Sequence, residues 1–333
     1  MRNARIFSLS VFLALLVYGG LGYALLPLAF FEGDLTRLAM LPERQFGWTR
    51  DQPAISPAWL QQSSMRDADV LVIGDSFSMG RVWQSTLTRE GEHVRTEHWD
   101  NLRAVCSDLP GFLRQQGFQG RHVVLQVVER NLERVVRESM ACTQTRYRRK
   151  HPVDGPQPTP AQQFKPDQID DHSGRFSVGL RTWLHARELE RKAQATDFSS
   201  WRITPDVRVS RVSNGCRLFS HHRCQEALFW AEDRAEDVPQ GVAEDMARLA
   251  GRLPGLVVTW VVVPNKTTAY LYPEKSFWDR SEALLHAPNL LRMARHQIAQ
   301  GTMDLYLGNN THFSTEGYLL MGQAIRDAMQ RAR

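Results

Sequence analysis

The stretch Val70-Leu71-Val72-Ile73-Gly74-Asp75-Ser76-Phe77-Ser78 indicates both the fold and a site. Its apolar, β-branched run is typical of a strand buried in a parallel sheet. The run stops at Gly74, so Asp75 and Ser76 follow the carboxyl end of the strand. Open α/β sheets bind ligands at this edge. A serine in this position either caps the next helix or is displayed to a cleft, and the strand alone leaves both alternatives open.

Three further apolar runs predict strands over residues 94–99, 121–128 and 256–263, with amphipathic segments between them. Strands that alternate with helices favour an α/β fold, with a parallel sheet covered by helices on both faces. The chain has 333 residues, of which 42% are hydrophobic and 23% charged. It is therefore long enough for one large domain of this class.

A second motif, Asn309-Asn310-Thr311-His312-Phe313-Ser314-Thr315-Glu316-Gly317-Tyr318, lies near the C-terminus. His312 stands in a polar loop before an apolar-periodic segment, residues 318–329, that predicts a closing helix. A serine nucleophile needs a base within hydrogen-bond reach, and histidine has a suitable pKa. Ser76 and His312 are therefore candidates for a nucleophile and its base, although a lone loop histidine can also be merely solvated.

Together the two motifs resemble those of the SGNH (GDSL-like) hydrolase superfamily. More narrowly, residues 69–329 resemble the AlgX/AlgJ-type domains of bacterial polysaccharide O-acetyltransferases. The resemblance implies a three-layer sandwich with a central parallel sheet. It also implies that Ser76 is the nucleophile and His312 the base.

The resemblance extends to further site residues. In SGNH enzymes an asparagine near the end of the third strand donates to the oxyanion, and the block Glu129-Arg130-Asn131 stands there, which implies this role for Asn131. Substrate contacts are implied for Arg103, Arg130 and Lys266. The alternatives stay open: Asn131 could cap a helix, Arg103 could lie on the surface, and Lys266 could be solvated.

The sequence departs from the family pattern before the histidine. The superfamily usually has an aspartate two or three residues earlier, and here Asn310 and Asn309 occupy those places. Asn310 or Asn309 could orient His312 through its side-chain carbonyl oxygen, while Asp304 and Asp75 are alternative orienters. Asp75 is also suited to bracing the serine turn. A second departure is that no family glycine follows the second strand.

The N-terminus predicts a membrane anchor. Residues 6–31 are uncharged and mostly apolar. This stretch is longer than the roughly 20 residues that span a bilayer. Basic residues precede this stretch and acidic residues follow it, so the body is expected outside the cytoplasm. The resemblance implies that this compartment is the bacterial periplasm. A cleaved signal peptide is the alternative. We expect residues 1–31 to be a cytoplasmic tip and anchor, 32–65 a connector, and 66–333 the SGNH-like domain with an insertion at about 143–205.

The four cysteines agree with export. Cys216 and Cys224 are eight residues apart and favour one small disulfide loop, which leaves Cys106 and Cys142 as a second pair. A zinc site that includes the intervening histidines is the competing interpretation, but its spacing fits no usual structural zinc pattern. We expect no metal and no other cofactor.

The chain carries a net charge of +5, with a pI near 9.2. This charge suits an acidic polysaccharide or an anionic membrane, and no recognisable nucleic-acid-binding motif accompanies it. The resemblance implies an inner-membrane O-acetyltransferase that modifies an alginate-like exopolysaccharide through a serine acyl-enzyme. It also implies a membrane-bound O-acyltransferase partner that supplies the acetyl group. The alternatives are an SGNH esterase or deacetylase, and a catalytically impaired polysaccharide-binding assembly subunit.

Overall fold

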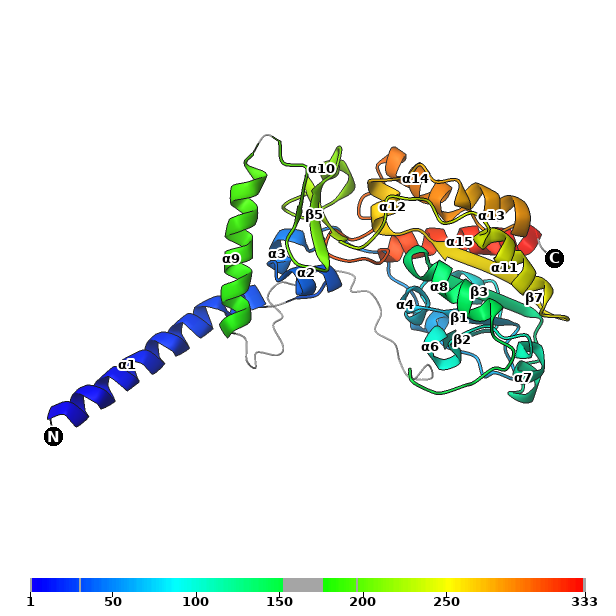
Figure 1. Ribbon diagram of the computed structural model, residues 1–333, viewed down its shortest axis with the longest axis horizontal. Coiled ribbons are helices and arrows are strands. Elements are labelled where there is room, and N and C mark those ends of the chain that lie inside the picture. The colour runs from blue at the N-terminus through cyan, green and yellow to red at the C-terminus, as the bar shows by residue number, and fades with distance from the viewer. Residues whose placement is uncertain (1, 30, 152–175, 196, 332–333) are drawn as a thin grey trace. The chain divides into compact units, whose positions relative to one another are not determined.

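The chain divides into two compact units. A computed structural model describes residues 2–29, 31–151, 176–195 and 197–331 (Figure 1). The first unit comprises Met1–Arg50, Gln163–Glu232 and Leu307–Thr311, and the second comprises Asp51–Gln162, Asp233–Tyr306 and His312–Arg333. Ser76 and His312 therefore belong to the same unit. The domain expected over residues 66–333 is divided between both units, because residues 200–230 form a separate sheet with its own core.

The second unit is built on a four-stranded parallel sheet, as the apolar runs predicted. Its order is β2-β1-β3-β7, and the strands are β1 (Val70–Gly74), β2 (Val94–His98), β3 (His122–Val128) and β7 (Val257–Val263). Val70 lies opposite Val94 on one side and His122 on the other. Because all four strands run the same way, the residues that follow them meet at one edge.

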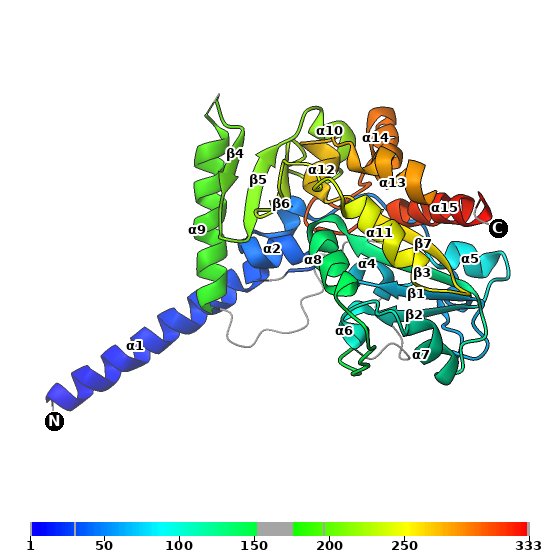
Figure 2. The ribbon, with the colours of Figure 1, turned by 45° about the vertical axis from the view of Figure 1, so that its right-hand side comes forward.

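Helices cover both faces of this sheet (Figure 2). Alternate residues of β1 point to opposite faces: Leu71 and Ile73 enter one buried apolar cluster, and Val70 and Val72 enter the other. The first cluster includes side chains of α6 (Trp99–Leu102), α7 (Leu109–Gln115), α8 (Glu129–Met140), α11 (Val242–Gly251) and α13 (Phe277–Leu285). The second includes side chains of α4 (Ser76–Met79), α5 (Ser85–Arg89), α12 (Lys266–Tyr270), α14 (Leu290–Gln300) and α15 (Thr315–Arg331). A short 3₁₀ helix, η2 (Pro57–Leu60), precedes the sheet.

The first unit contains an antiparallel sheet of order β4-β5-β6. Its strands are β4 (Ser200–Arg202), β5 (Val207–Arg211) and β6 (Glu226–Trp230), and α10 (Gly215–Leu218) lies between the last two. Leu35 of α2 (Asp34–Ala39), Phe46 of α3 (Glu43–Phe46) and Leu189 of α9 (Phe176–Ala193) are buried with β5 in one core. Part of the expected connector is thus folded, because its apolar residues complete this core. Within the expected insertion, residues 152–175 lie outside the described residues.

The N-terminal apolar segment is helical. The helix α1 (Arg2–Leu25) is followed by a 3₁₀ turn, η1 (Leu26–Ala29), so the helix ends before the expected limit at residue 31. The most apolar 18-residue window within Asn3–Leu25 has a mean hydropathy of 1.9, and none of this window is buried. This helix is therefore long and apolar enough to cross a membrane.

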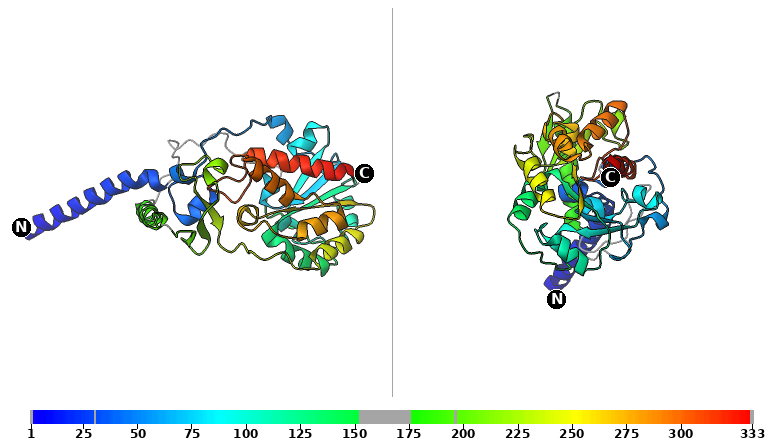
Figure 3. Two further views of the ribbon diagram at one scale, coloured as in Figure 1. Left: turned by 90° about the horizontal axis from the view of Figure 1, so that it is seen from above. Right: turned by 90° about the vertical axis from the view of Figure 1, so that its right-hand side faces the viewer.

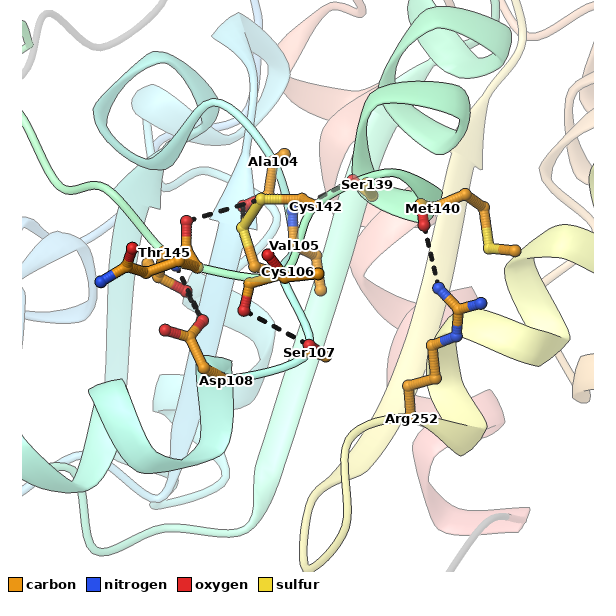
Figure 4. Close-up of a disulfide and its surroundings, with 12 residues drawn as sticks. Ala104, Val105, Cys106, Ser107, Asp108, Ser139, Met140, Cys142, Thr145 and Arg252 are labelled. Carbon is orange, nitrogen blue, oxygen red and sulfur yellow. Dashed lines mark hydrogen bonds between the residues drawn. A yellow bond between two sulfur atoms is a disulfide. The ribbon is translucent and has the colours of Figure 1, made fainter.

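Both expected disulfides are present, and no free cysteine occurs among the described residues. Cys106–Cys142 joins the segment before α7 to the segment after α8 (Figure 4). Nearby, Ser139 Oγ accepts a hydrogen bond from Val105 N at 3.0 Å, and Asp108 Oδ1 accepts one from Thr145 N at 2.8 Å. Because Cys216 and Cys224 are bonded to each other, they offer no thiolates for the zinc site considered above.

The two disulfides are expected to differ in their effect on stability. They close loops of 36 and 8 residues, and a longer loop restricts the unfolded chain more. Replacing Cys106 and Cys142 by alanine should lower the free energy of unfolding by about 4 kcal/mol, and replacing Cys216 and Cys224 should lower it by about 2.5 kcal/mol. Urea unfolding of the two double variants checks this order. A larger loss for the Cys216/Cys224 variant would contradict it.

Candidate functional site

Ser76 is presented by a tight turn at the carboxyl end of β1. The strand ends at Gly74, and the exposed Ser76 is the first residue of α4. A Cβ atom on residue 74 would lie 2.4 Å from Ser78 Oγ and 2.9 Å from Gln126 Oε1. Only glycine therefore lets the backbone turn this closely, which explains the Gly-Asp-Ser order.

The carboxylate of Asp75 braces this turn. Its Oδ1 accepts hydrogen bonds from Phe77 N at 3.0 Å and Gln126 Nε2 at 2.9 Å, and its Oδ2 accepts one from Val128 N at 2.7 Å. Gln126 Oε1 in turn accepts from Asp75 N at 3.1 Å and from Ser78 Oγ at 2.6 Å. The turn after β1 is thus bonded to β3 by a network of polar side chains, and both Asp75 oxygens take part in it.

His312 is held at the same edge by the segment before α15. Tyr306 and Phe313 form an isolated antiparallel bridge, and Ser314 N donates to Leu305 O at 3.0 Å. The ring of Phe77 lies 4.6 Å from the ring of His312, centroid to centroid. The imidazole is thus fixed between a bridged backbone and an aromatic side chain.

The two predicted catalytic residues are in hydrogen-bond contact. His312 Nε2 lies 2.8 Å from Ser76 Oγ, within the range expected for a nucleophile and its base. When Nε2 is unprotonated it accepts the hydroxyl hydrogen, which raises the nucleophilicity of the oxygen. Since Ser76 is exposed and His312 is half-buried, a substrate can reach the pair.

The residues that follow β3 lie beside this pair at the sheet edge. Strands β1 and β3 are direct neighbours, and half-buried Asn131 stands in the first turn of α8, two residues after its start. Arg130 Nη1 lies 3.5 Å from Asp233 Oδ1 and 3.2 Å from Asn265 Oδ1. Burial raises the pKa of Asp233, while the Arg130 charge opposes this rise.

Glu129 connects the ends of β3 and β7 through buried polar contacts. One carboxylate oxygen accepts from Asn265 N at 2.9 Å and Thr268 Oγ1 at 2.6 Å, and the other accepts from Lys275 Nζ at 2.6 Å. The Glu129 and Lys275 side chains are only 6% and 1% exposed. This pair fixes the backbone from which Arg130 and Asn131 project.

Two predicted substrate contacts differ in their surroundings. Arg103 is exposed at the end of α6, with a left-handed backbone (φ 65°) that non-glycine residues seldom adopt. Lys266 is the first residue of α12 and is only 1% exposed, so it is not a solvated surface lysine. Both predicted contacts stay predictions.

The two asparagines before His312 fall in the segment assigned to the first unit. Asn309 is fully buried there, and its amide donates to a carboxylate oxygen of Glu43. Burial raises the pKa of Glu43, an effect opposed by hydrogen bonds from Thr36 and Asn309. Asn310 donates its backbone N–H to Leu307 O at 3.2 Å. The role of Asn310 as orienter of His312 stays a prediction.

A possible donor set for a metal ion lies at the end of β2. His98, Asp100 and His151 each offer one ligand atom, and these atoms lie within 4.8 Å of one another. However, His98 Nδ1 accepts a hydrogen bond from Asp100 N at 3.0 Å, and His151 Nε2 lies 3.1 Å from Asp100 Oδ2. Burial, reinforced by His151, lowers the pKa of His98. One ring nitrogen of His98 and one of His151 thus already form a hydrogen bond with Asp100.

A cavity of about 250 Å³ lies on one face of the sheet and is separate from the Ser76–His312 pair. Leu71 and Ile73 of β1 contribute to its apolar lining, and Glu97 to its polar lining. Tyr147 Oη donates to Glu97 Oε2 at 3.3 Å. Burial and the Glu97 charge raise the pKa of Tyr147.

Gln126 is the site residue that our sequence analysis missed. It is completely buried in β3 and contacts both Asp75 and Ser78, while its backbone oxygen accepts from Trp99 Nε1 at 2.5 Å. The available sign was a single amide side chain within a strand that is otherwise apolar after His122. A buried polar group needs partners, so this glutamine indicates a polar contact at the strand, although the sequence does not say which residues provide it.

Replacing Asp75 by asparagine is expected to weaken the turn. An amide nitrogen in place of Oδ2 would face the donor Val128 N, so the free energy of unfolding should fall by about 1–3 kcal/mol. Urea unfolding checks this, with Asp67→Asn as the control because Asp67 is exposed. An Asp75→Asn variant with unchanged stability would contradict this bracing role.

No family model matches the sequence, and neither a curated protein nor a solved structure matches it.

Proposed function

We propose that the protein is a membrane-anchored O-acyltransferase that acetylates a polysaccharide through an acyl-enzyme on Ser76. The observation that carries this proposal is the 2.8 Å contact between Ser76 Oγ and His312 Nε2. It occurs at the carboxyl edge of a parallel sheet, where ligands bind in open α/β folds.

In the first half-reaction, Ser76 Oγ attacks the carbonyl carbon of an acetyl donor while His312 takes the hydroxyl proton. The tetrahedral intermediate collapses, and the leaving group departs with the proton returned by His312. In the second half-reaction, His312 deprotonates a sugar hydroxyl, which attacks the acetyl-serine. Ser76 regains its proton, and the acetyl group ends on the sugar.

The developing oxyanion needs donors that are already in place. We assign the backbone N–H of Ser76 and the side-chain amide of Asn131 to this role. The exposed Arg103 and the partly exposed Arg130 are the cations proposed to meet an acidic, alginate-like glycan. The reaction as written needs neither a metal nor another cofactor.

The family and compartment form part of the same proposal. We assign residues 69–329 to the SGNH superfamily as an AlgX/AlgJ-type domain, with α1 in the bacterial inner membrane and the remainder in the periplasm. A membrane-bound O-acyltransferase would supply the acetyl group. Two disulfides and a helix of membrane-spanning length support this compartment.

An acceptor experiment distinguishes transfer from hydrolysis. Full-length protein in detergent is given an aryl acetate, with and without an acidic oligosaccharide, and the products are analysed by mass spectrometry. We expect acetylated oligosaccharide from wild type and none from the Ser76→Ala variant. Free acetate as the sole product at every acceptor concentration would instead assign an esterase. Glycan binding without any turnover would assign a binding subunit.

A further inference from the structure

The outward face of α9 exposes three large apolar side chains. Leu180, Trp183 and Leu184 are 39%, 42% and 50% exposed, and their i, i+3, i+4 spacing places them on one face of the helix. On the opposite face, Leu189 is completely buried and His185 Nδ1 lies 2.7 Å from Ala39 O. The apolar patch of Leu180, Trp183 and Leu184 is therefore additional to the face that α9 packs into its own core.

The patch adjoins the end of the membrane-spanning helix. A Cβ atom on Gly179 would lie 2.7 Å from Leu25 O and 2.9 Å from Leu25 Cβ, so the first turn of α9 touches the last residue of α1. The absence of a side chain at residue 179 permits this contact. The exposed apolar surface thus begins where the candidate span ends.

The direction of α9 suits a helix that lies along a membrane surface. Figure 1 shows α9 beginning at the C-terminal end of α1 and running across it. In the left-hand view of Figure 3, α1 lies lengthwise while α9 is seen almost end-on. If α1 crosses the bilayer, α9 therefore lies close to the membrane plane, as interfacial amphipathic helices do.

The charged residues of α9 are mostly basic, as binding to an anionic membrane surface requires. The helix contains four arginine or lysine residues and two glutamates. The Arg187 guanidinium lies 5.5 Å from the Trp183 ring centroid, and Arg191 pairs with Glu188. Tryptophan and basic residues together are typical of the boundary between acyl chains and headgroups.

We propose that α9 lies in the lipid interface next to the point where α1 leaves the bilayer. Leu180, Trp183 and Leu184 insert among the upper acyl chains, and Arg187 meets anionic headgroups. The first unit is thereby attached to the membrane at two places, α1 and α9. This proposal depends on α1 crossing the bilayer and is independent of the catalytic proposal.

Site-directed spin labelling of the full chain tests this proposal. Leu184→Cys and Leu180→Cys, each labelled with a nitroxide, are reconstituted into nanodiscs of phosphatidylethanolamine and phosphatidylglycerol. The native cysteines are disulfide-bonded and do not react. Collision rates with oxygen, which concentrates in lipid, and with a water-soluble nickel chelate are measured. We expect the label at either position to collide more often with oxygen than with the chelate.

Two further labelled variants provide reference collision rates for lipid and for water. Leu13→Cys in α1 gives the value for lipid, and Leu284→Cys, an exposed leucine of the second unit (48% exposed), gives the value for water. Labels at 180 and 184 that resemble Leu284→Cys would overturn the proposal. Shielding from both reagents would assign the patch to a protein partner and overturn it as well. A water-like value at Leu13→Cys would show that the premise of a spanning α1 is wrong.

Discussion

Replacing Ser76 by alanine is expected to lower the rate of ester cleavage by about 10⁴-fold or more, with little change in stability. The hydroxyl is the atom that forms the acyl bond in our proposal, and losing the nucleophile of a serine–histidine pair removes the covalent route altogether. Because Ser76 is exposed, removing its hydroxyl group leaves no buried cavity.

The His312→Gln variant should lose activity to a similar degree, and the double variant should be no worse than either single variant. Residues that act as one unit have non-additive effects on rate. Initial rates with an aryl acetate check this, with Ser213→Ala as the control because Ser213 is also exposed. Multiplicative losses in the double variant would mean that the two residues act independently.

Replacing Lys275 by methionine should lower the free energy of unfolding of the second unit by about 3–5 kcal/mol. The substitution leaves the carboxylate of Glu129 buried without its cationic partner, and breaking a buried ion pair on one side has this effect. Because Glu129 also binds Asn265 N and Thr268 Oγ1, the segment that carries Arg130 and Asn131 should loosen.

The double variant Glu129→Gln/Lys275→Met distinguishes the effect of an unpaired buried charge from the effect of lost side-chain packing. It removes both charges, so it should recover part of the lost stability. Lys150→Met, which alters an exposed lysine, should stay within about 0.5 kcal/mol of wild type. Urea unfolding measures all three variants. If Lys275→Met lowers the free energy of unfolding by less than about 1 kcal/mol, the buried carboxylate of Glu129 does not need this lysine as its partner.

The parallel sheet could be predicted because its strands are short, apolar and β-branched, a pattern that arises from burial on both faces. The runs around Val70 and Val257 both proved to be strands of this sheet. The disulfide pairing could also be predicted, because a spacing of eight residues favours a local loop and leaves one remaining pair.

The contacts that brace the site could not be predicted, because they join residues distant in the chain. Gln126 lies 51 residues after Asp75, and Asn309 donates to Glu43 across 266 residues. The C-terminal motif is one continuous segment of the sequence, yet Asn309 and His312 are assigned to different units. Local sequence could suggest that the asparagines serve the histidine, but could not reveal that Asn309 is engaged with Glu43.

Acylation of Ser76 is the central claim, and mass spectrometry of the protein itself tests it most directly. Full-length protein is mixed with an aryl acetate without acceptor, quenched in acid and digested. The account predicts one acetyl group on the peptide that contains Ser76 and none on the same peptide from the His312→Gln variant. An unmodified Ser76 peptide from wild type that is turning over the ester would contradict the account.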